Sequence, residues 1–155
     1  MSVEFPMGKQ ERAARLSLIG LVLIAGYYGY ALYNQGTWDL ALAAGRAGEH
    51  IIRNTIILGL ILEVLHWQLT RKPQAGEALE DERDRAIRAA GTRSAFGVTV
   101  AGLFALSWQL YIELRLPEFH QLPAGLMAHV PLLILFLAYS VKYLTEILLY
   151  LRDRT

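Results

Sequence analysis

The chain has 155 residues, of which 54% are hydrophobic and 19% charged, with a net charge of +1 and no cysteine. The lack of cysteine excludes disulfide and thiol chemistry, and the small net charge argues against direct nucleic-acid binding. The charged residues are concentrated in a few segments with long apolar runs between them. This distribution is typical of an integral membrane protein rather than of a soluble domain.

The first predicted membrane span covers residues 13–33. No charged residue occurs from Leu16 to Tyr33, and a helix needs about 20 mostly apolar residues to cross the bilayer core. The segment that follows, Asn34 to Trp38, is bulky and polar, unlike the small-residue cleavage site of a signal peptide. We therefore expect a span that is retained in the mature protein.

Three further spans are predicted, at residues 50–69, 92–114 and 126–151. Because every backbone polar group inside a bilayer has to be satisfied within the protein, these spans are helices. The sequence thus predicts an all-α, polytopic membrane protein, with a single domain of residues 1–155 that forms a four-transmembrane-helix bundle. Residues 70–91 form its central loop.

Basic residues predict the orientation, because the cytoplasmic flanks of membrane spans are enriched in Lys and Arg. The two terminal flanks and the 70–91 loop are rich in Lys and Arg, whereas the two remaining loops are poor in both. We therefore expect both termini and the 70–91 loop to be cytoplasmic. Aromatic residues near the span ends, such as Trp67, Trp108 and Tyr150, suit the headgroup level of the bilayer.

Ionisable residues interrupt two of the spans. Glu63 and His66 in the second span are spaced i,i+3, which places both on one face of a helix. Lys142 and Glu146 in the fourth span are spaced i,i+4 and lie at a similar depth. We expect these four residues to meet in one intramembrane polar layer, with Glu63 and Lys142 as the preferred interhelical pair.

An ionisable residue inside a span is costly and is by default a functional hypothesis. Three interpretations of the layer stay open: charges that pair and fix the helix register, a proton or ion relay through Glu63 and His66, and a metal site. The Glu-x-x-His spacing occurs in di-iron bundles, but the chain holds one such motif, so a metal site would require a dimer. A metal or haem site can also be drawn from the outer-side His50, His120 and His129, although scattered interfacial histidines usually bind nothing.

The densest charge cluster lies at the end of the central loop and comprises Asp81, Glu82, Arg83, Asp84, Arg85 and Arg88. Acidic residues lead and basic residues follow, the order that favours a helix N-terminus and i,i+4 ion pairs. We therefore expect the third helix to begin near Glu80 and to project about three turns into the cytoplasm. This extension is either a solvated topology anchor or a docking surface for a cytoplasmic protein.

The run Asp81-Glu82-Arg83-Asp84, with Ile87 three residues later, resembles the Asp-Glu-Arg-Asp-x-x-Ile motif of a bacterial and archaeal family of small four-helix integral membrane proteins of unknown function. The similarity continues in residues 10–13 and 26–28 and in residues 141–152, although Arg152-Asp153-Arg154 departs from the usual double arginine and glycine. The resemblance implies no activity. Genes of similar proteins often lie beside a gene for a helix-turn-helix regulator, which implies a role in signalling.

These observations predict a multi-pass protein of the bacterial inner membrane that is not an enzyme and has no cofactor. The leading hypothesis is a regulatory or accessory component that acts by protein–protein contact and uses the charged run as its docking surface. The alternative is a small proton- or ion-coupled transporter that uses the polar layer. Small residues such as the Gly97-x-x-x-Ala101 step allow either internal packing or a homodimer.

Overall fold

A computed structural model describes four segments of the chain, residues 8–34, 46–70, 82–116 and 124–153. Each segment consists almost entirely of one α-helix: α1 (Lys9–Asn34), α2 (Arg46–Thr70), α3 (Glu82–Arg115) and α4 (Ala124–Arg152). Each helix contains the span predicted for it, and all four are long and apolar enough to cross a membrane. The prediction of an all-α protein with four candidate membrane spans is confirmed. Residues 71–81 of the predicted loop, including Asp81, lie outside the described residues.

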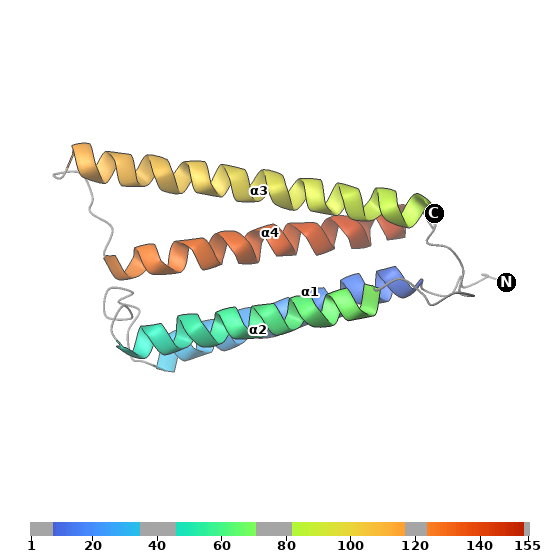
Figure 1. Cartoon of the computed structure of the whole chain (residues 1–155), viewed down its shortest axis with the longest axis horizontal. Helices are drawn as coiled ribbons and strands as arrows, with labels where there is room; N and C mark the ends of the chain where they lie inside the picture. The colour runs from blue at the N-terminus through green and yellow to red at the C-terminus, as the bar shows by residue number, and fades with distance from the viewer. Residues whose placement is uncertain (1–7, 35–45, 71–81, 117–123, 154–155) are drawn as a thin grey trace.

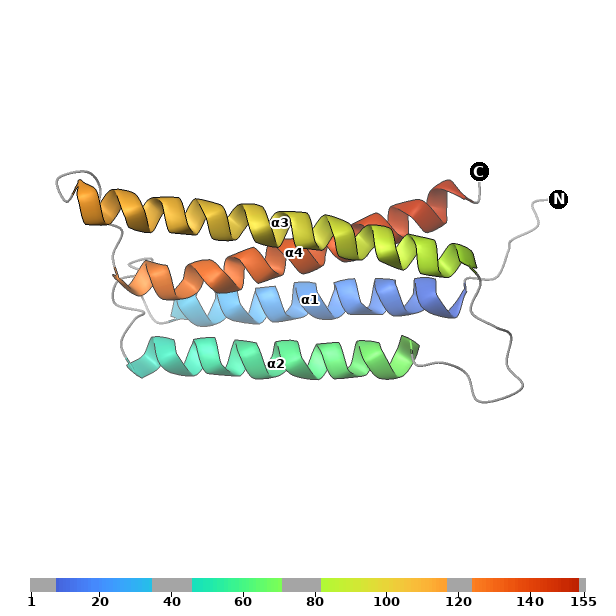
Figure 2. The same cartoon turned by 45° about the horizontal axis from the view of Figure 1, so that its top comes forward.

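The four helices form an open bundle. α4 packs against α1 on one side and against α3 on the other, and α1 also packs against α2. The helices therefore follow one another in the order α3, α4, α1, α2, with α3 at the edge (Figure 2). The first residues of α1 and α3 and the last residues of α2 and α4 lie at the same end of the molecule (Figure 1).

Polar side chains are buried between the helices, while large apolar side chains cover the outside. Ser17, Thr55, His66, His129 and Glu146 are all more than nine-tenths buried. The surface carries large apolar side chains on every helix, and those of Phe96, Phe104 and Leu114 in α3 are at least 70% exposed. A soluble protein does not expose apolar surface of this extent. The distribution suits a bundle whose surroundings are lipid and whose polar groups are satisfied inside the protein.

The third helix is longer than a bilayer requires. Its 34 residues span about 51 Å at 1.5 Å per residue, compared with about 30 Å for the hydrocarbon core. The helix begins at Glu82, within two residues of the predicted start, and its first turns carry the charged run. The described part of this run is therefore a helical extension of a membrane span, as the acid-first charge order predicts.

Two glycines of α3 allow a close approach to α4. A Cβ atom at Gly102 would lie 2.8 Å from Cγ2 of Ile134, and one at Gly91 would lie 2.7 Å from Cγ of Glu146 and 3.1 Å from the Lys142 carbonyl oxygen. Neither position has room for a methyl group. Gly97 lies between them in sequence but faces open space, so the Gly97-x-x-x-Ala101 step is not the face that packs on α4.

The two glycine environments predict opposite responses to the same substitution. Gly102→Leu should lower the free energy of unfolding by about 1–3 kcal/mol, because the new side chain overpacks the α3–α4 contact at Ile134. Gly97→Leu, at a position without a neighbour, should leave stability nearly unchanged. Thermal unfolding of both variants in the same detergent micelles measures the difference, and equal destabilisation would contradict this packing of α3 on α4.

Candidate functional site

One hydrogen-bonded group joins three helices near the end of the bundle that the sequence predicts to be cytoplasmic. Oγ of Ser17 in α1 lies 2.7 Å from Nδ1 of His66 in α2, and Ser17 is also a hydrogen-bond partner of the Tyr143 side chain in α4. The His66 and Tyr143 rings pack with their centroids 5.3 Å apart. All three side chains are buried, so Ser17 connects α1 to both of its neighbours.

Charged side chains from α3 and α4 surround this group. Lys142 and Arg88 lie close enough to His66 and to Glu146 to interact with both electrostatically. Glu63 acts in the same way on Glu146 and on Tyr143. We call the seven residues the polar layer: Ser17, Glu63, His66, Arg88, Lys142, Tyr143 and Glu146. All four helices contribute to it, whereas the sequence suggests helices two and four only.

Lys142 does not pair with Glu63, the partner that the sequence suggests for it. Among the described residues, Lys142 and Glu63 form no ion pair. The ammonium group of Lys142 lies instead over the rings of Tyr143 and Tyr139, 5.0 and 5.7 Å from their centroids. Aromatic faces attract cations at such distances, and both tyrosines also line the cavity that Glu63 lines.

Glu146 is the most confined charged group of the layer. Its side chain is buried at the α3–α4 contact, where the absence of a side chain at Gly91 leaves room for it. Within the described part of the chain, Oε1 of Glu146 has no hydrogen-bond partner. Buried polar atoms are nearly always hydrogen-bonded, so this oxygen requires an explanation beyond simple packing.

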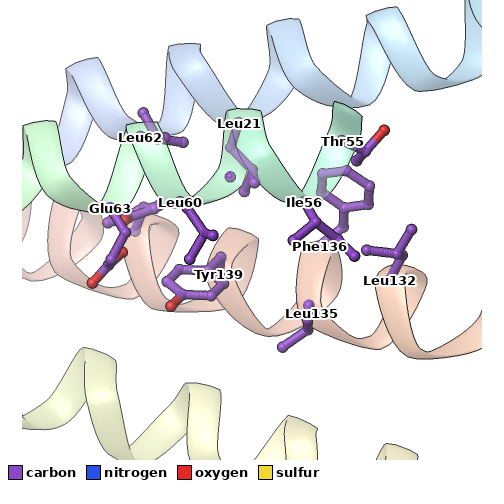
Figure 3. A pocket seen from close by; sticks show the side chains of 12 residues that line it. Leu21, Thr55, Ile56, Leu60, Leu62, Glu63, Leu132, Leu135, Phe136 and Tyr139 are labelled. Atoms are coloured by element: carbon purple, nitrogen blue, oxygen red, sulfur yellow. The ribbon is translucent and has the colours of Figure 1, made fainter. Parts of the chain in front are cut away.

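A cavity of about 220 Å³ lies between α1, α2 and α4 next to the polar layer. Glu63 and Tyr139 lie at one end of it, and Thr55 and Leu132 lie at the other (Figure 3). The remaining wall is mostly leucine, isoleucine and phenylalanine. The cavity is therefore an apolar space with one charged residue in its wall.

A second set of contacts, which we call the α3–α4 latch, joins the first turn of α3 to the end of α4. The sequence predicts this end of the bundle to be cytoplasmic. The Tyr150 hydroxyl donates to Oδ1 of Asp84 over 3.0 Å, and Nε of Arg83 donates to Oδ2 of Asp153 over 3.0 Å. Ile87 is buried beside them. Arg83 and Asp84 of the predicted docking motif thus contact α4, and Arg88 belongs to the polar layer. Glu82 and Arg85 lie at the surface.

The histidines that the sequence predicts on the outer side have separate surroundings in the structure. His129 is buried and its Nδ1 hydrogen-bonds the hydroxyl of Tyr28, whereas Nδ1 of the exposed His50 lies 2.7 Å from Nη2 of Arg53. His120 lies outside the described residues. Within the described helices, no three His, Asp or Glu side chains gather closely enough to hold a metal ion.

The sequence signals for the remaining members of the site are weak. Ser17 and Tyr143 are not predicted, because a single serine and one tyrosine among many in apolar spans carry no distinctive spacing. Asn54 of α2 makes an interhelical hydrogen bond, in which its Nδ2 donates to the Tyr27 hydroxyl of α1 over 3.3 Å. The buried hydroxyl of Thr55 has no partner among the described residues.

No protein family, curated protein or solved structure matches this chain. The resemblance to the small four-helix family therefore rests on its motif residues and stays a hypothesis. The function has to be inferred from the geometry of the polar layer, the cavity and the latch.

Removing the hydroxyl that connects the three helices tests the layer directly. Ser17→Ala should lower the free energy of unfolding by about 1–3 kcal/mol, because buried His66 and Tyr143 both lose a hydrogen-bond partner. Ser107→Ala, at an exposed position of α3, is the matched control and should change stability little. Thermal unfolding in detergent provides the comparison, and an unchanged Ser17→Ala variant would show that the hydrogen bonds contribute nothing.

Proposed function

We propose that the chain is a small proton- or ion-coupled membrane transporter that works through the polar layer, with His66 and Glu146 as the groups that exchange protons. The observation that carries this proposal is the buried carboxyl group of Glu146, with one oxygen that lacks a hydrogen-bond partner among the described residues. A purely structural ion pair is stable when its remaining lone pairs are also satisfied. An unsatisfied carboxyl oxygen beside two cationic side chains instead suits a group that exchanges a proton or an ion.

The surroundings of Glu146 supply a route for protons. Hydroxyl and imidazole groups both donate and accept hydrogen bonds, so Tyr143, Ser17 and His66 form a chain along which a proton can move. Charged and titratable groups inside membrane spans commonly mark such pathways. Lys142 and Arg88 lie within electrostatic range of Glu146 and offset its negative charge.

Neutral substitution of the buried carboxyl group tests this function. Glu146→Gln preserves side-chain volume but cannot release a proton, so proton flux into proteoliposomes with an imposed membrane potential should fall by at least about tenfold. Flux is followed with a trapped pH-sensitive dye, with and without Na⁺ or K⁺. Glu49→Gln, at an exposed position of α2, is the control and should transport normally.

Two results would contradict the proposal. The first is wild-type flux no greater than that of protein-free liposomes in every ion tested. The second is a Glu146→Gln variant with normal flux but a lower unfolding temperature, which would assign the layer to helix register alone.

A second candidate function is a regulatory or accessory component that binds a cytoplasmic protein, and the α3–α4 latch favours it. The latch fixes the start of α3 against the end of α4, so the exposed Glu82 and Arg85 are held on a rigid surface. Preorganised charged surfaces guide partner choice and association. In this proposal the latch end faces the cytoplasm of a bacterial cell, the chain lies in the inner membrane, and a homodimer through α3 is compatible with its open edge.

Photo-crosslinking in cells tests the second candidate. A crosslinking residue at exposed Ala86 should capture a defined cytoplasmic protein, and Arg85→Glu should reduce the product about tenfold by reversing a contact charge. Arg115→Glu, at the opposite end of α3, should have no effect. Absence of a specific product, or a product that is insensitive to Arg85→Glu, would exclude docking at this surface.

A further inference from the structure

We propose that the cavity between α1, α2 and α4 binds a compact amphipathic organic cation, with Glu63 as its counter-ion. The proposal rests on the transport function for its physiological meaning, because it names the class of substrate. Binding itself can be measured without transport, so the two proposals can fail separately.

The first argument is the unbalanced charge of Glu63. Among the described residues, the Glu63 carboxylate forms no hydrogen bond or ion pair, and it is the one charged residue in the wall of the cavity. It lies seven residues before Thr70, the last residue of α2, or about 10 Å into the span at 1.5 Å per residue. A carboxylate at this depth is costly without a cationic partner, and the cavity beside it leaves space for one.

The second argument is the chemistry of the opposite wall. Phe136 and Tyr139 place aromatic rings along the α4 side of the cavity (Figure 3). Tyr143, also from α4, lines the cavity as well. A cation over an aromatic face is stabilised within about 6 Å of the ring centroid, and Lys142 already uses the two tyrosine rings in this way. A cavity with a carboxylate at one end and aromatic side chains in its wall is therefore suited to an organic ammonium group.

The apolar lining does not suit an inorganic cation. An inorganic cation such as Na⁺, K⁺ or Mg²⁺ needs several oxygen ligands, whereas leucine, isoleucine and phenylalanine make up most of this wall. The depth of Glu63 also separates it from lipid headgroups at the interface. The ligand therefore combines a positive group with an apolar body.

The size of the cavity limits the ligand. Its volume of about 220 Å³ is below the range of roughly 300–1,000 Å³ that is typical of sites for drug-sized molecules. Gly59 contributes to this space, because a Cβ atom at that position would meet no other atom within 4 Å. We therefore expect a molecule with a single ring or a short chain, and a side chain at position 59 should block it.

Equilibrium binding in nanodiscs of uncharged phosphatidylcholine tests the proposal. The probe is benzyltrimethylammonium, and its control is neopentylbenzene, which has the same shape without the charge. The wild-type protein should bind the cation at least about tenfold more tightly than the neutral compound. Calorimetric titration provides both affinities.

Two substitutions separate the charge from the space. Glu63→Gln should weaken cation binding about tenfold and leave neopentylbenzene binding unchanged, because only the ion pair is lost. Gly59→Leu should weaken binding of both compounds by filling the cavity. Glu49→Gln and Gly26→Leu are the matched controls, at exposed positions where the new side chain meets no neighbour, and both should bind as the wild type does.

The proposal is overturned if the wild type does not prefer the cation, or if folded Glu63→Gln binds it normally. If Glu63→Gln does not fold, Gly59→Leu decides, since normal cation binding by that variant would also overturn the proposal. Cation binding without proton flux would reject transport and keep this site. Proton flux without cation binding would reject this site and keep transport.

Discussion

A carboxylate that is buried among membrane helices has to be balanced by its neighbours, and Glu146 imposes this requirement where α3 meets α4. Gly91 supplies the space and Arg88 and Lys142 supply opposite charge. Lys142 in turn lies over Tyr143, which shares Ser17 with His66. Each polar group is thus in contact with the next, and these contacts connect all four helices. In a lipid environment, where apolar surfaces gain little by association, such polar contacts and close packing set the helix arrangement.

The elements themselves could be predicted from the sequence because their length and apolar character are local properties. The start of α3 near Glu82 follows from acids that precede bases, and the four spans follow from uncharged runs of sufficient length. Helix partners are not local. The Tyr150–Asp84 hydrogen bond joins residues 66 positions apart, and the i,i+4 rule describes pairs within one helix only. The same limit explains why Glu63 and Lys142 share a depth without forming a pair.

The site shows a similar division. Spacing places Glu63 with His66 on one helix and Lys142 with Glu146 on another. The structure brings Lys142 within electrostatic range of His66 and Glu146, and Glu63 within range of Glu146. The small and neutral members could not be predicted, because Ser17 acquires its importance only from the two side chains that converge on it. Gly91 is a similar case, because it matters only through lacking a side chain at the place that the Glu146 side chain occupies. The role of a residue that depends on contacts with distant parts of the chain cannot be predicted from a single sequence.

The latch and the polar layer are successive contacts of the same helix pair, and this arrangement links the two candidate functions. Asp84, Ile87, Arg88 and Gly91 lie along one face of α3, one or two turns apart. The first two lie in the latch region, and the last two contact or face Glu146. A change in the charge of Glu146 therefore acts on the same α3–α4 contact that holds Glu82 and Arg85 in place. Transport through the layer and signalling from its cytoplasmic-predicted end would then be two consequences of one helix contact.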